Sequence, residues 1–351
     1  MANPYSVQKM IYYPDVVDAL SKKASHLLNP ITIHFMPQNK CNHNCGFCSY
    51  RLDNWRNSES FDAKSHLPLK KICSLFDEFE DMVVQGLEIT GGGEPLLHPD
   101  VDKWLFELSK HTFATALVTN GVLLNEERAD LLFNTNLRWV RISIDAGDKN
   151  TYSNTRNVAS SQWFKAWDAV HRVVHRRTDE VIGVGFVVNE INWHSVYRFC
   201  GMAEQANVDN VRISLAFTPK GSNLLDESQY KHVENALELA RQDFDVKIYD
   251  MVRERFNNCN HERTYDYCAT KDLLCVIEGA GNVYACCTLT GSKDGKWGNI
   301  LHGSFKELWD KSMLWRGKFN IHKHCKGPCL YDARNLVMEG IRNMPDHLEF
   351  I

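Results

Sequence analysis

The sequence predicts an α/β fold: a partial (β/α)6 barrel of the TIM type over residues 31–254, followed by a small C-terminal α+β unit. Six short apolar runs alternate with segments whose apolar residues recur at helical spacing. Strands that alternate with helices in this way form a parallel sheet. From about residue 255 the alternation stops and cysteines become frequent, which indicates a second unit organised around metal ligands.

The predicted strands are apolar runs bounded by turn residues. They are residues 31–36, 86–90, 113–119, 138–144, 181–188 and 211–216. Helices are expected after Ser65 and Pro68, around 101–110, after Asn125, from Trp163 to Val174, around 194–206 and from Tyr230 to Ala240. A short strand near Val246 to Tyr249 ends the series. In barrels of this type the active site lies at the carboxyl ends of the strands.

Composition and charge narrow the class of protein. The chain has 351 residues, 44% of them apolar, and a formal net charge of −4, so bulk attraction to nucleic acid or to an anionic membrane is not expected. The sequence has neither an apolar run of about 20 residues nor a signal peptide, which predicts a cytoplasmic protein with no membrane partner. Its 12 cysteines then favour metal ligation or redox chemistry over disulfides.

The loop CNHNCGFC, residues 41–48, places three cysteines directly after the first predicted strand: Cys41, Cys45 and Cys48. Three thiolates hold three irons of a [4Fe-4S] cluster and leave the fourth iron open to a small molecule. Two alternatives are a zinc site with His43 as the fourth ligand and three ordinary buried cysteines.

This loop, with Phe47 before its last cysteine, resembles the signature of the radical S-adenosylmethionine (radical SAM) enzymes. The second predicted strand ends in TGGGEP, residues 90–95, which resembles the GGEP motif of that family. Glycine has no Cβ, so its backbone can approach a ligand closely. The resemblance implies a [4Fe-4S] cluster on the three cysteines and contacts to SAM from Phe47, Gly91, Gly92, Gly93 and Glu94.

Further matches to the family are looser. RISIDAG, residues 141–147, resembles its fourth-strand element and implies SAM contacts from Ser143 and Asp145. Arg156 lies where relatives carry an arginine that binds the methionine carboxylate, a role that suits its planar fork; the alternative is a solvated surface arginine. The same choice between a site role and an ordinary one is open for Gly183, Gly185, Asn189, Arg212 and Ser214.

The C-terminal cysteines resemble the auxiliary-cluster domain called SPASM or, in its shorter form, twitch. The resemblance implies a second [4Fe-4S] cluster whose irons are all ligated, by Cys268, Cys286, Cys325 and Cys329. The alternatives are a zinc ribbon on the same four residues and replacement of Cys268 or Cys286 by Cys275 or Cys287. The implied division is an extension over 1–30, the barrel over 31–254, the auxiliary domain over 255–335 and a tail over 336–351.

The family's mechanism implies that SAM is cleaved reductively to a 5′-deoxyadenosyl radical, which takes a hydrogen atom from a small molecule or nucleotide. The electron would come from a reductant such as flavodoxin or ferredoxin. A fully ligated auxiliary cluster favours electron transfer and therefore oxidation. Open alternatives are a redox-neutral isomerase or epimerase, including one acting on a modified nucleotide or nucleic acid, a ribosomal-peptide maturase, and a non-enzymatic electron carrier or redox sensor. The sequence identifies no catalytic acid, base or hydrogen donor.

Overall fold

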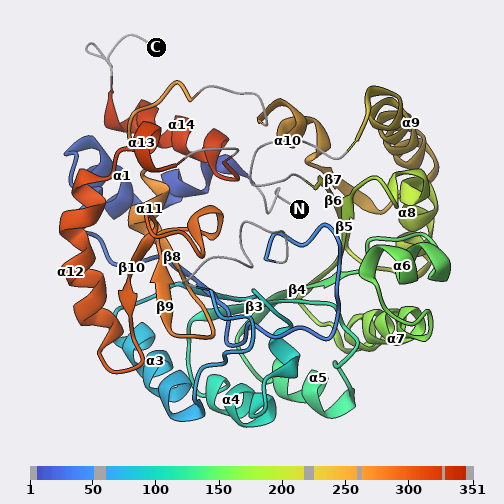
Figure 1. Ribbon diagram of the computed structural model, residues 1–351, viewed down its shortest axis with the longest axis horizontal. Coiled ribbons are helices and arrows are strands. Elements are labelled where there is room, and N and C mark those ends of the chain that lie inside the picture. Colours follow the sequence, from blue (N-terminus) through green and yellow to red (C-terminus); the bar gives the residue numbers. More distant parts are fainter. Residues whose placement is uncertain (1–5, 51–60, 217–224, 259–262, 326–328, 345–351) are drawn as a thin grey trace.

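The computed structural model describes residues 6–50, 61–216, 225–258, 263–325 and 329–344. Figure 1 shows an arc of strands with helices α3 to α9 on its outer side. Helices α10 and α14 and the N-terminal helices lie across the open side of the arc. The α/β class and the partial barrel predicted from the sequence are confirmed.

All strands of the described chain belong to one sheet, in the order β10-β9-β8-β1-β2-β3-β4-β5-β6-β7. Their bounds are β1 Thr32–Phe35, β2 Gly86–Ile89, β3 Ala114–Thr119, β4 Leu137–Ser143, β5 Val181–Val188, β6 Asn210–Leu215, β7 Lys247–Asp250, β8 Leu274–Ile277, β9 Asn282–Tyr284 and β10 Lys296–Asn299. Each neighbouring pair from β1 to β7 is parallel. The six predicted barrel strands are therefore present, and the short strand near residue 247 extends them.

Helices α3, α4, α5, α7, α8 and α9 follow the strands as the hydrophobic spacing predicts. Their bounds are α1 Pro14–Ser21, α3 Leu69–Asp81, α4 Val101–Leu108, α5 Glu126–Phe133, α6 Lys149–Arg156, α7 Ser161–Arg176, α8 Val196–Gln205, α9 Glu227–Asp243, α10 Val252–Asn258, α11 Thr270–Leu273, α12 Phe305–Lys318, α13 Ile321–His324 and α14 Asp332–Arg342. Short 3-10 helices are η1 Val7–Tyr12, η2 Ser25–Leu27, η3 Pro95–Leu97, η4 Trp193–Ser195 and η5 Cys287–Leu289. No helix in the described ranges is both long enough and apolar enough to cross a bilayer.

Alternation along each strand separates a buried core from the barrel interior. On β1, Ile33 and Phe35 are fully buried, and the Phe35 ring packs edge-on against Phe76 of α3 with centroids 5.7 Å apart. Successive side chains of a strand point to opposite faces, so His34 and its β2 neighbour Glu88 lie on the inner face, where they approach to 3.8 Å. Residues on the inner face of the sheet can be polar, because it is the outer face that forms the apolar core with the helices.

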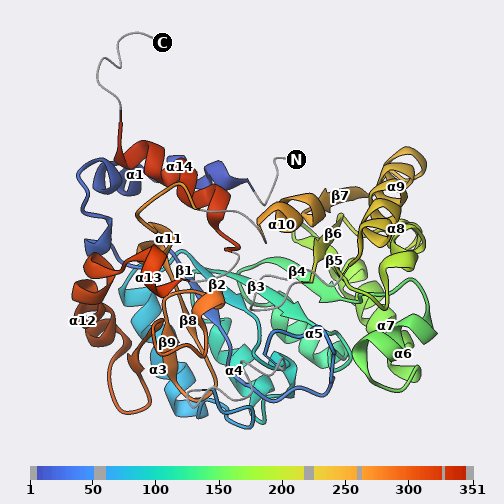
Figure 2. The ribbon, with the colours of Figure 1, turned by 45° about the horizontal axis from the view of Figure 1, so that its top comes forward.

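The cysteine-rich unit continues the barrel sheet. Strand β8 pairs in parallel with β1, and β9 and β10 follow in antiparallel order. Figures 1 and 2 both show α12 outside this hairpin, beside α3. The predicted domain boundaries at 254 and 335 stay predictions, although α14 runs through residue 335.

A buried polar cluster joins the C-terminal hairpin to the segment before the cysteine loop. The Glu278 carboxylate is fully buried and accepts hydrogen bonds from Asn39 Nδ2, Asn282 Nδ2 and the Ala280 amide. The Gly279 amide donates in turn to Asn39 Oδ1, at 3.0 Å. Glu278 therefore fixes the hairpin against the strand that leads into the loop.

Replacing Glu278 by Ala is expected to lower the free energy of unfolding by at least about 2 kcal/mol, because three donors lose their acceptor in a buried site. Urea denaturation measures the change. The exposed Glu307, which belongs to α12, provides the control, and Glu307→Ala should change stability by less than about 0.5 kcal/mol. Equal effects of the two substitutions would contradict the assigned role of Glu278.

The N-terminal segment packs against the C-terminal helix. Met10, Val16 and Leu20 share a small apolar cluster with Leu273 and Met338. This contact places η1 and α14 side by side over the open face of the barrel, as Figure 1 shows.

Candidate active site

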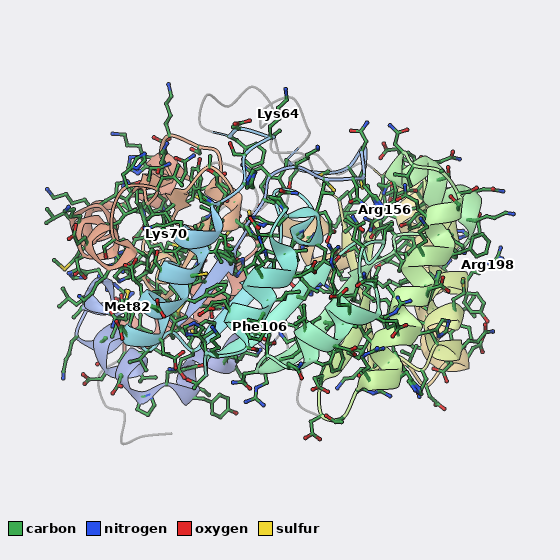
Figure 3. All side chains as sticks on the ribbon, turned by 90° about the horizontal axis from the view of Figure 1, so that it is seen from below. Lys64, Lys70, Met82, Phe106, Arg156 and Arg198 are labelled. Atoms are coloured by element: carbon green, nitrogen blue, oxygen red, sulfur yellow. The ribbon has the colours of Figure 1, made fainter. Side chains whose placement is uncertain are left out.

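The cysteine loop lies at the carboxyl-terminal edge of the barrel, as predicted. In Figure 3, Lys70, at the start of α3, lies nearer the upper edge than Met82, which follows its end. Because helices of a parallel sheet run opposite to the strands, the carboxyl ends of the strands face this upper edge, toward which Lys64 and Arg156 lie. The loop and the end of α6 therefore share one edge of the sheet.

Three hydrogen bonds hold the loop to the ends of neighbouring strands. The Glu94 amide donates to the carbonyl of Lys40 at 3.0 Å, and Asn120 Nδ2, just past β3, donates to Asn42 Oδ1 at 2.8 Å. The amide of Asn44 donates to the carbonyl of Arg156 at 3.1 Å. These contacts fix the loop from β2, β3 and α6.

The glycine turn after β2 packs directly on the backbone that enters the cysteine loop. A Cβ on Gly93 would lie 2.2 Å from the carbonyl oxygen of Lys40, and one on Gly91 would lie 1.7 Å from the carbonyl oxygen of Gly93. A Cβ on Gly92 would lie 2.9 Å from the Phe61 ring. All three positions are thus closed to side chains.

The Glu94 carboxylate closes the turn. It accepts hydrogen bonds from Thr119 Oγ1 at 2.6 Å, from the Asn120 amide at 2.9 Å and from the Leu96 amide at 3.1 Å. Burial raises the pKa of Glu94, and these donors oppose the rise. The Glu94 side chain is therefore occupied by hydrogen bonds with the end of β3. A SAM contact from the glycine turn would come from the backbone of the turn.

Gly93→Ala is expected to displace the cysteine loop and weaken SAM binding by at least about tenfold, because real Cβ atoms do not sit 2.2 Å from a carbonyl oxygen. Equilibrium binding of SAM to the reconstituted protein measures the effect. Gly340→Ala is the matched control, since nothing lies within 4 Å of a Cβ at that position on α14. Unchanged SAM affinity in Gly93→Ala would contradict a role for the turn.

Arg156 is buried, which excludes the solvated surface arginine. Its side chain forms an ion pair with the equally buried Asp145, and its Nη1 lies 3.9 Å from Cys45 Sγ. Burial lowers the pKa of Arg156, but the negative charges of Asp145 and Cys45 outweigh burial and raise it overall. The guanidinium is therefore a fixed positive charge beside the loop thiols.

Asp145 holds this arginine from an unusual backbone position. Its φ is +59°, a left-handed conformation that few non-glycine residues adopt, and its Oδ1 accepts a hydrogen bond from the Val187 amide at 2.7 Å. Asp145 thus contacts Arg156 and β5 directly.

The other predicted residues lie near the same edge. Ser143 ends β4 and is paired in register with Gly185, and Phe47 is half-buried in the loop. The ring of His43 is buried, and its Nε2 is hydrogen-bonded to Gln162 Oε1 at 2.8 Å. That bond anchors the His43 ring to α7.

The C-terminal cysteines gather in a second buried cluster. Cys286 and Cys325 belong to one apolar cluster, and Cys268 packs against it. Burial, and then the charges of the neighbouring cysteines Cys287, Cys325, Cys268 and Cys329, raise the pKa of Cys286 well above its usual value. Cys275 is fully buried in the main core on β8, away from this group. Cys287 lies beside Cys286 and is hydrogen-bonded to the Tyr331 hydroxyl at 3.3 Å.

Within the described ranges, no three side chains of His, Cys, Asp or Glu are close enough together to hold a metal ion as they are placed. The donor sets nevertheless fit iron-sulfur clusters. Such clusters take thiolate ligands, and ligation deprotonates the thiols. Three thiols on one loop and four in the C-terminal unit match the donor sets of an open and a closed site.

A cavity of about 730 Å³ connects these regions. Its lining includes Thr90 and Gly91 of the glycine turn, Tyr50 after the cysteine loop, Cys329 of the second cluster, and Cys287, which follows Cys286. It also runs along the inner face of β1 to β6. The cavity thus adjoins the glycine turn and the C-terminal cysteines, whereas Cys41, Cys45 and Cys48 are not among its lining residues.

Sequence reasoning missed several residues that build the site. Asn42, Asn120 and Asn39 position the loop through hydrogen bonds, and the signal available was the Asn-Gly turn after the third strand. Helix α6 was also missed, because its sequence, KNTYSNTR, has little apolar character. It begins where Asp148 Oδ1 accepts hydrogen bonds from the Asn150 and Thr151 amides.

Comparison with known proteins points to the radical SAM enzymes, as the cysteine loop and the glycine turn do. Residues 35–202 match the model of the Radical SAM superfamily. A GTP 3′,8-cyclase of Staphylococcus saprophyticus is 26% identical over 302 residues, 75% of this chain and 84% of the relative. An AdoMet-dependent heme synthase of Methanosarcina barkeri is 23% identical, over 86% of this chain and 88% of the relative.

Two solved structures share the fold. Streptococcus suis SuiB bound to S-adenosylmethionine has a TM-score of 0.62 at 16% identity, over 84% of this chain and 69% of SuiB. The anSMEcpe structure with bound AdoMet has a TM-score of 0.62 at 18% identity, over 89% of this chain and 96% of that one. With the cysteine loop, the glycine turn and the partial barrel in place, residues 35–202 form a radical SAM domain, and members of that superfamily use a [4Fe-4S] cluster and SAM.

Proposed function

We propose that this radical SAM enzyme abstracts a hydrogen atom from a small molecule or nucleotide held in the barrel interior. The observation that carries the proposal is the cavity, which touches the glycine turn on one side and the second cysteine cluster on the other. Its volume of about 730 Å³ falls within the range of small-molecule sites, roughly 300–1,000 Å³.

Cys41, Cys45 and Cys48 would hold a [4Fe-4S] cluster, which would supply the electron for reductive cleavage of SAM. The chain positions the reactants. The turn at Gly91 to Gly93 offers backbone groups to SAM, and Arg156 provides a fixed positive charge beside the loop. The covering helices α10 and α14 keep water from the cavity, where a carbon radical would otherwise be exposed to side reactions.

We assign Cys268, Cys286, Cys325 and Cys329 to an auxiliary [4Fe-4S] cluster of the twitch type. Four thiolates leave no iron open to substrate, so its role is electron transfer, which favours oxidation of the substrate. The external electron donor is a small redox protein of the flavodoxin or ferredoxin class. Support comes from the cavity, since Cys329 lines it.

A nucleotide rearranged without net oxidation is the second candidate. It is favoured by the similarity to a GTP 3′,8-cyclase over 84% of that relative's length. A peptide substrate is less well supported: SuiB is solved with its precursor peptide SuiA, but that likeness at 16% identity concerns the fold alone. A pure electron carrier would give the glycine turn and the cavity no purpose.

Anaerobic incubation of the reconstituted protein with dithionite and SAM tests the proposal. Formation of 5′-deoxyadenosine is expected, with faster turnover and deuterium transfer into 5′-deoxyadenosine when a deuterated substrate is present. Absence of 5′-deoxyadenosine from protein with a full iron complement would refute the enzymatic function.

A further inference from the structure

We infer that the cavity contains an anion-binding seat formed by Arg141 and Arg212 across the glycines of β5, and that the substrate is an oxyanion. This inference rests on the proposed function, because it describes the same cavity. It begins with a repeated tetrapeptide: VRIS occurs at residues 140–143 on β4 and again at 211–214 on β6.

The repeat places both arginines on the inner face of the barrel. In each copy the apolar residues, such as Ile142 and Ile213, are fully buried in the core, so the alternating residues face the other way. Arg141 and Arg212 both line the cavity. Strands β4 and β6 therefore each carry an arginine that lines the cavity, one on either side of β5.

That intervening strand, β5, has no side chains at the corresponding positions. Gly183 is paired with Arg141, and Gly185 is paired with Ser143 on one side and Arg212 on the other. A Cβ on Gly185 would lie only 3.4 Å from Arg141 Cδ, so the arginine stem lies close over this glycine. Asn210, which is paired with Gly183 on β6, lies close over that glycine, since a Cβ there would be 2.6 Å from Asn210 Oδ1. The two glycines therefore keep β5 free of side chains of its own, so that none separates Arg141 from Arg212.

Two further groups prepare the seat. The Arg141 guanidinium lies 5.2 Å from the centre of the Trp139 ring, a cation–π contact that restrains its position. On β6, Ser214 lies on the same face as Arg212 and is 1% exposed. Its hydroxyl has no hydrogen-bond partner among the described residues, and a buried polar group of this kind is normally satisfied. A bound oxyanion would accept hydrogen bonds from both arginines and from such a hydroxyl.

The charge of the whole lining agrees with this inference. Six cationic residues line the cavity: Lys9, Arg138, Arg141, Arg212, Arg255 and Arg334. The lining contains two carboxylates, Glu88 and Glu254, so the formal balance of these groups is six minus two, or +4. The chain as a whole carries −4. Positive charge is therefore concentrated in the cavity, where low-dielectric walls strengthen its field.

The charges on two elements that lie over the barrel agree with an anionic ligand. Burial, and then the like charge of Arg334, lower the pKa of Lys9, while Glu88 opposes the fall. Lys9 belongs to η1 and Arg334 to α14, the elements that cross the open side of the barrel in Figure 1. An anion with several charges would relieve this repulsion and engage the arginines below, whose planar forks match phosphate or carboxylate.

Binding of inorganic tripolyphosphate and, separately, of citrate tests the inference by calorimetry at constant ionic strength. Arg141→Gln and Arg212→Gln are expected to weaken the tighter of the two ligands by at least about tenfold each, since a charged hydrogen bond contributes roughly 1.5–3 kcal/mol. Preference for tripolyphosphate indicates a phosphorylated substrate, and preference for citrate indicates a carboxylate. The exposed Arg253, outside the cavity lining, is the control: Arg253→Gln should bind like the parent protein.

Gly185→Val tests whether the anion binds at this seat or is only attracted by the positive charge of the cavity as a whole. It retains every cation but displaces the stem of Arg141, whose Cδ lies 3.4 Å from a Cβ at this position, so it too should abolish binding, while its thermal melting should show that the protein is folded. Binding that responds to Arg253→Gln as strongly as to Arg141→Gln, or that survives Gly185→Val, would overturn the inference. SAM cleavage by the parent protein is measured in parallel: its absence refutes the proposed function, whereas its presence without arginine-dependent anion binding refutes only the seat.

Discussion

Cys45→Ala is expected to abolish reductive SAM cleavage and to remove about four irons per chain, the content of one [4Fe-4S] cluster. Cys45 is one of three thiols on the loop, and its sulfur lies 3.9 Å from Arg156 Nη1. Loss of an outer partner of a metal site costs roughly 10–100-fold in affinity or activity, so loss of a direct ligand should cost at least about 100-fold. The rate of 5′-deoxyadenosine formation and the iron content measure the two effects.

Cys73→Ala is the matched control for this substitution. Cys73 is a half-buried cysteine on α3, and its replacement should leave iron content and SAM cleavage unchanged. Cys45→Ala protein that keeps its full iron and cleaves SAM would contradict the assignment of the loop.

Cys325→Ala is expected to remove the second cluster and to spare SAM cleavage, the reverse of Cys45→Ala. It should also remove about four irons per chain but leave SAM cleavage in place, because it alters the second cluster alone. Formation of the oxidised product should stop, since the electron left on the substrate radical has no acceptor. Iron analysis and product analysis on one preparation give both results.

The outcome of Cys325→Ala also discriminates between the candidate reactions. Unaltered product with about half of the iron would exclude electron transfer by the auxiliary site and favour the redox-neutral rearrangement. Loss of both clusters would show that the four thiols support the fold as a whole, and Cys200→Ala, a buried cysteine on α8 outside both groups, shows how far a core cysteine alone affects folding.

The sequence predicts the repeating units of the fold because local periodicity encodes them. Strand β5 was expected at 181–188 and is found at Val181–Val188, since its continuous apolar run is bounded by polar residues. Pairings between distant segments leave no local signal. The parallel pairing of β8 with β1 joins residues more than 200 positions apart, and no periodicity in either segment indicates it.

The candidate site divides in the same way. Cys41 and the glycine turn are recognisable because spacing within a few residues carries their chemistry. The ion pair of Arg156 with Asp145 depends on α6, whose polar sequence gave no helical pattern. The anion seat depends on the register of three strands, and only the repeated VRIS at residues 140–143 and 211–214 hinted at it.

Electron paramagnetic resonance of the reduced protein, with and without SAM, tests the central claim most directly. The claim is that one cluster site is open to SAM and the other is closed. Addition of SAM should change the signal of one cluster only, and this change should persist in Cys325→Ala and be absent from Cys45→Ala. A SAM-dependent change that is lost in Cys325→Ala but retained in Cys45→Ala would contradict the account.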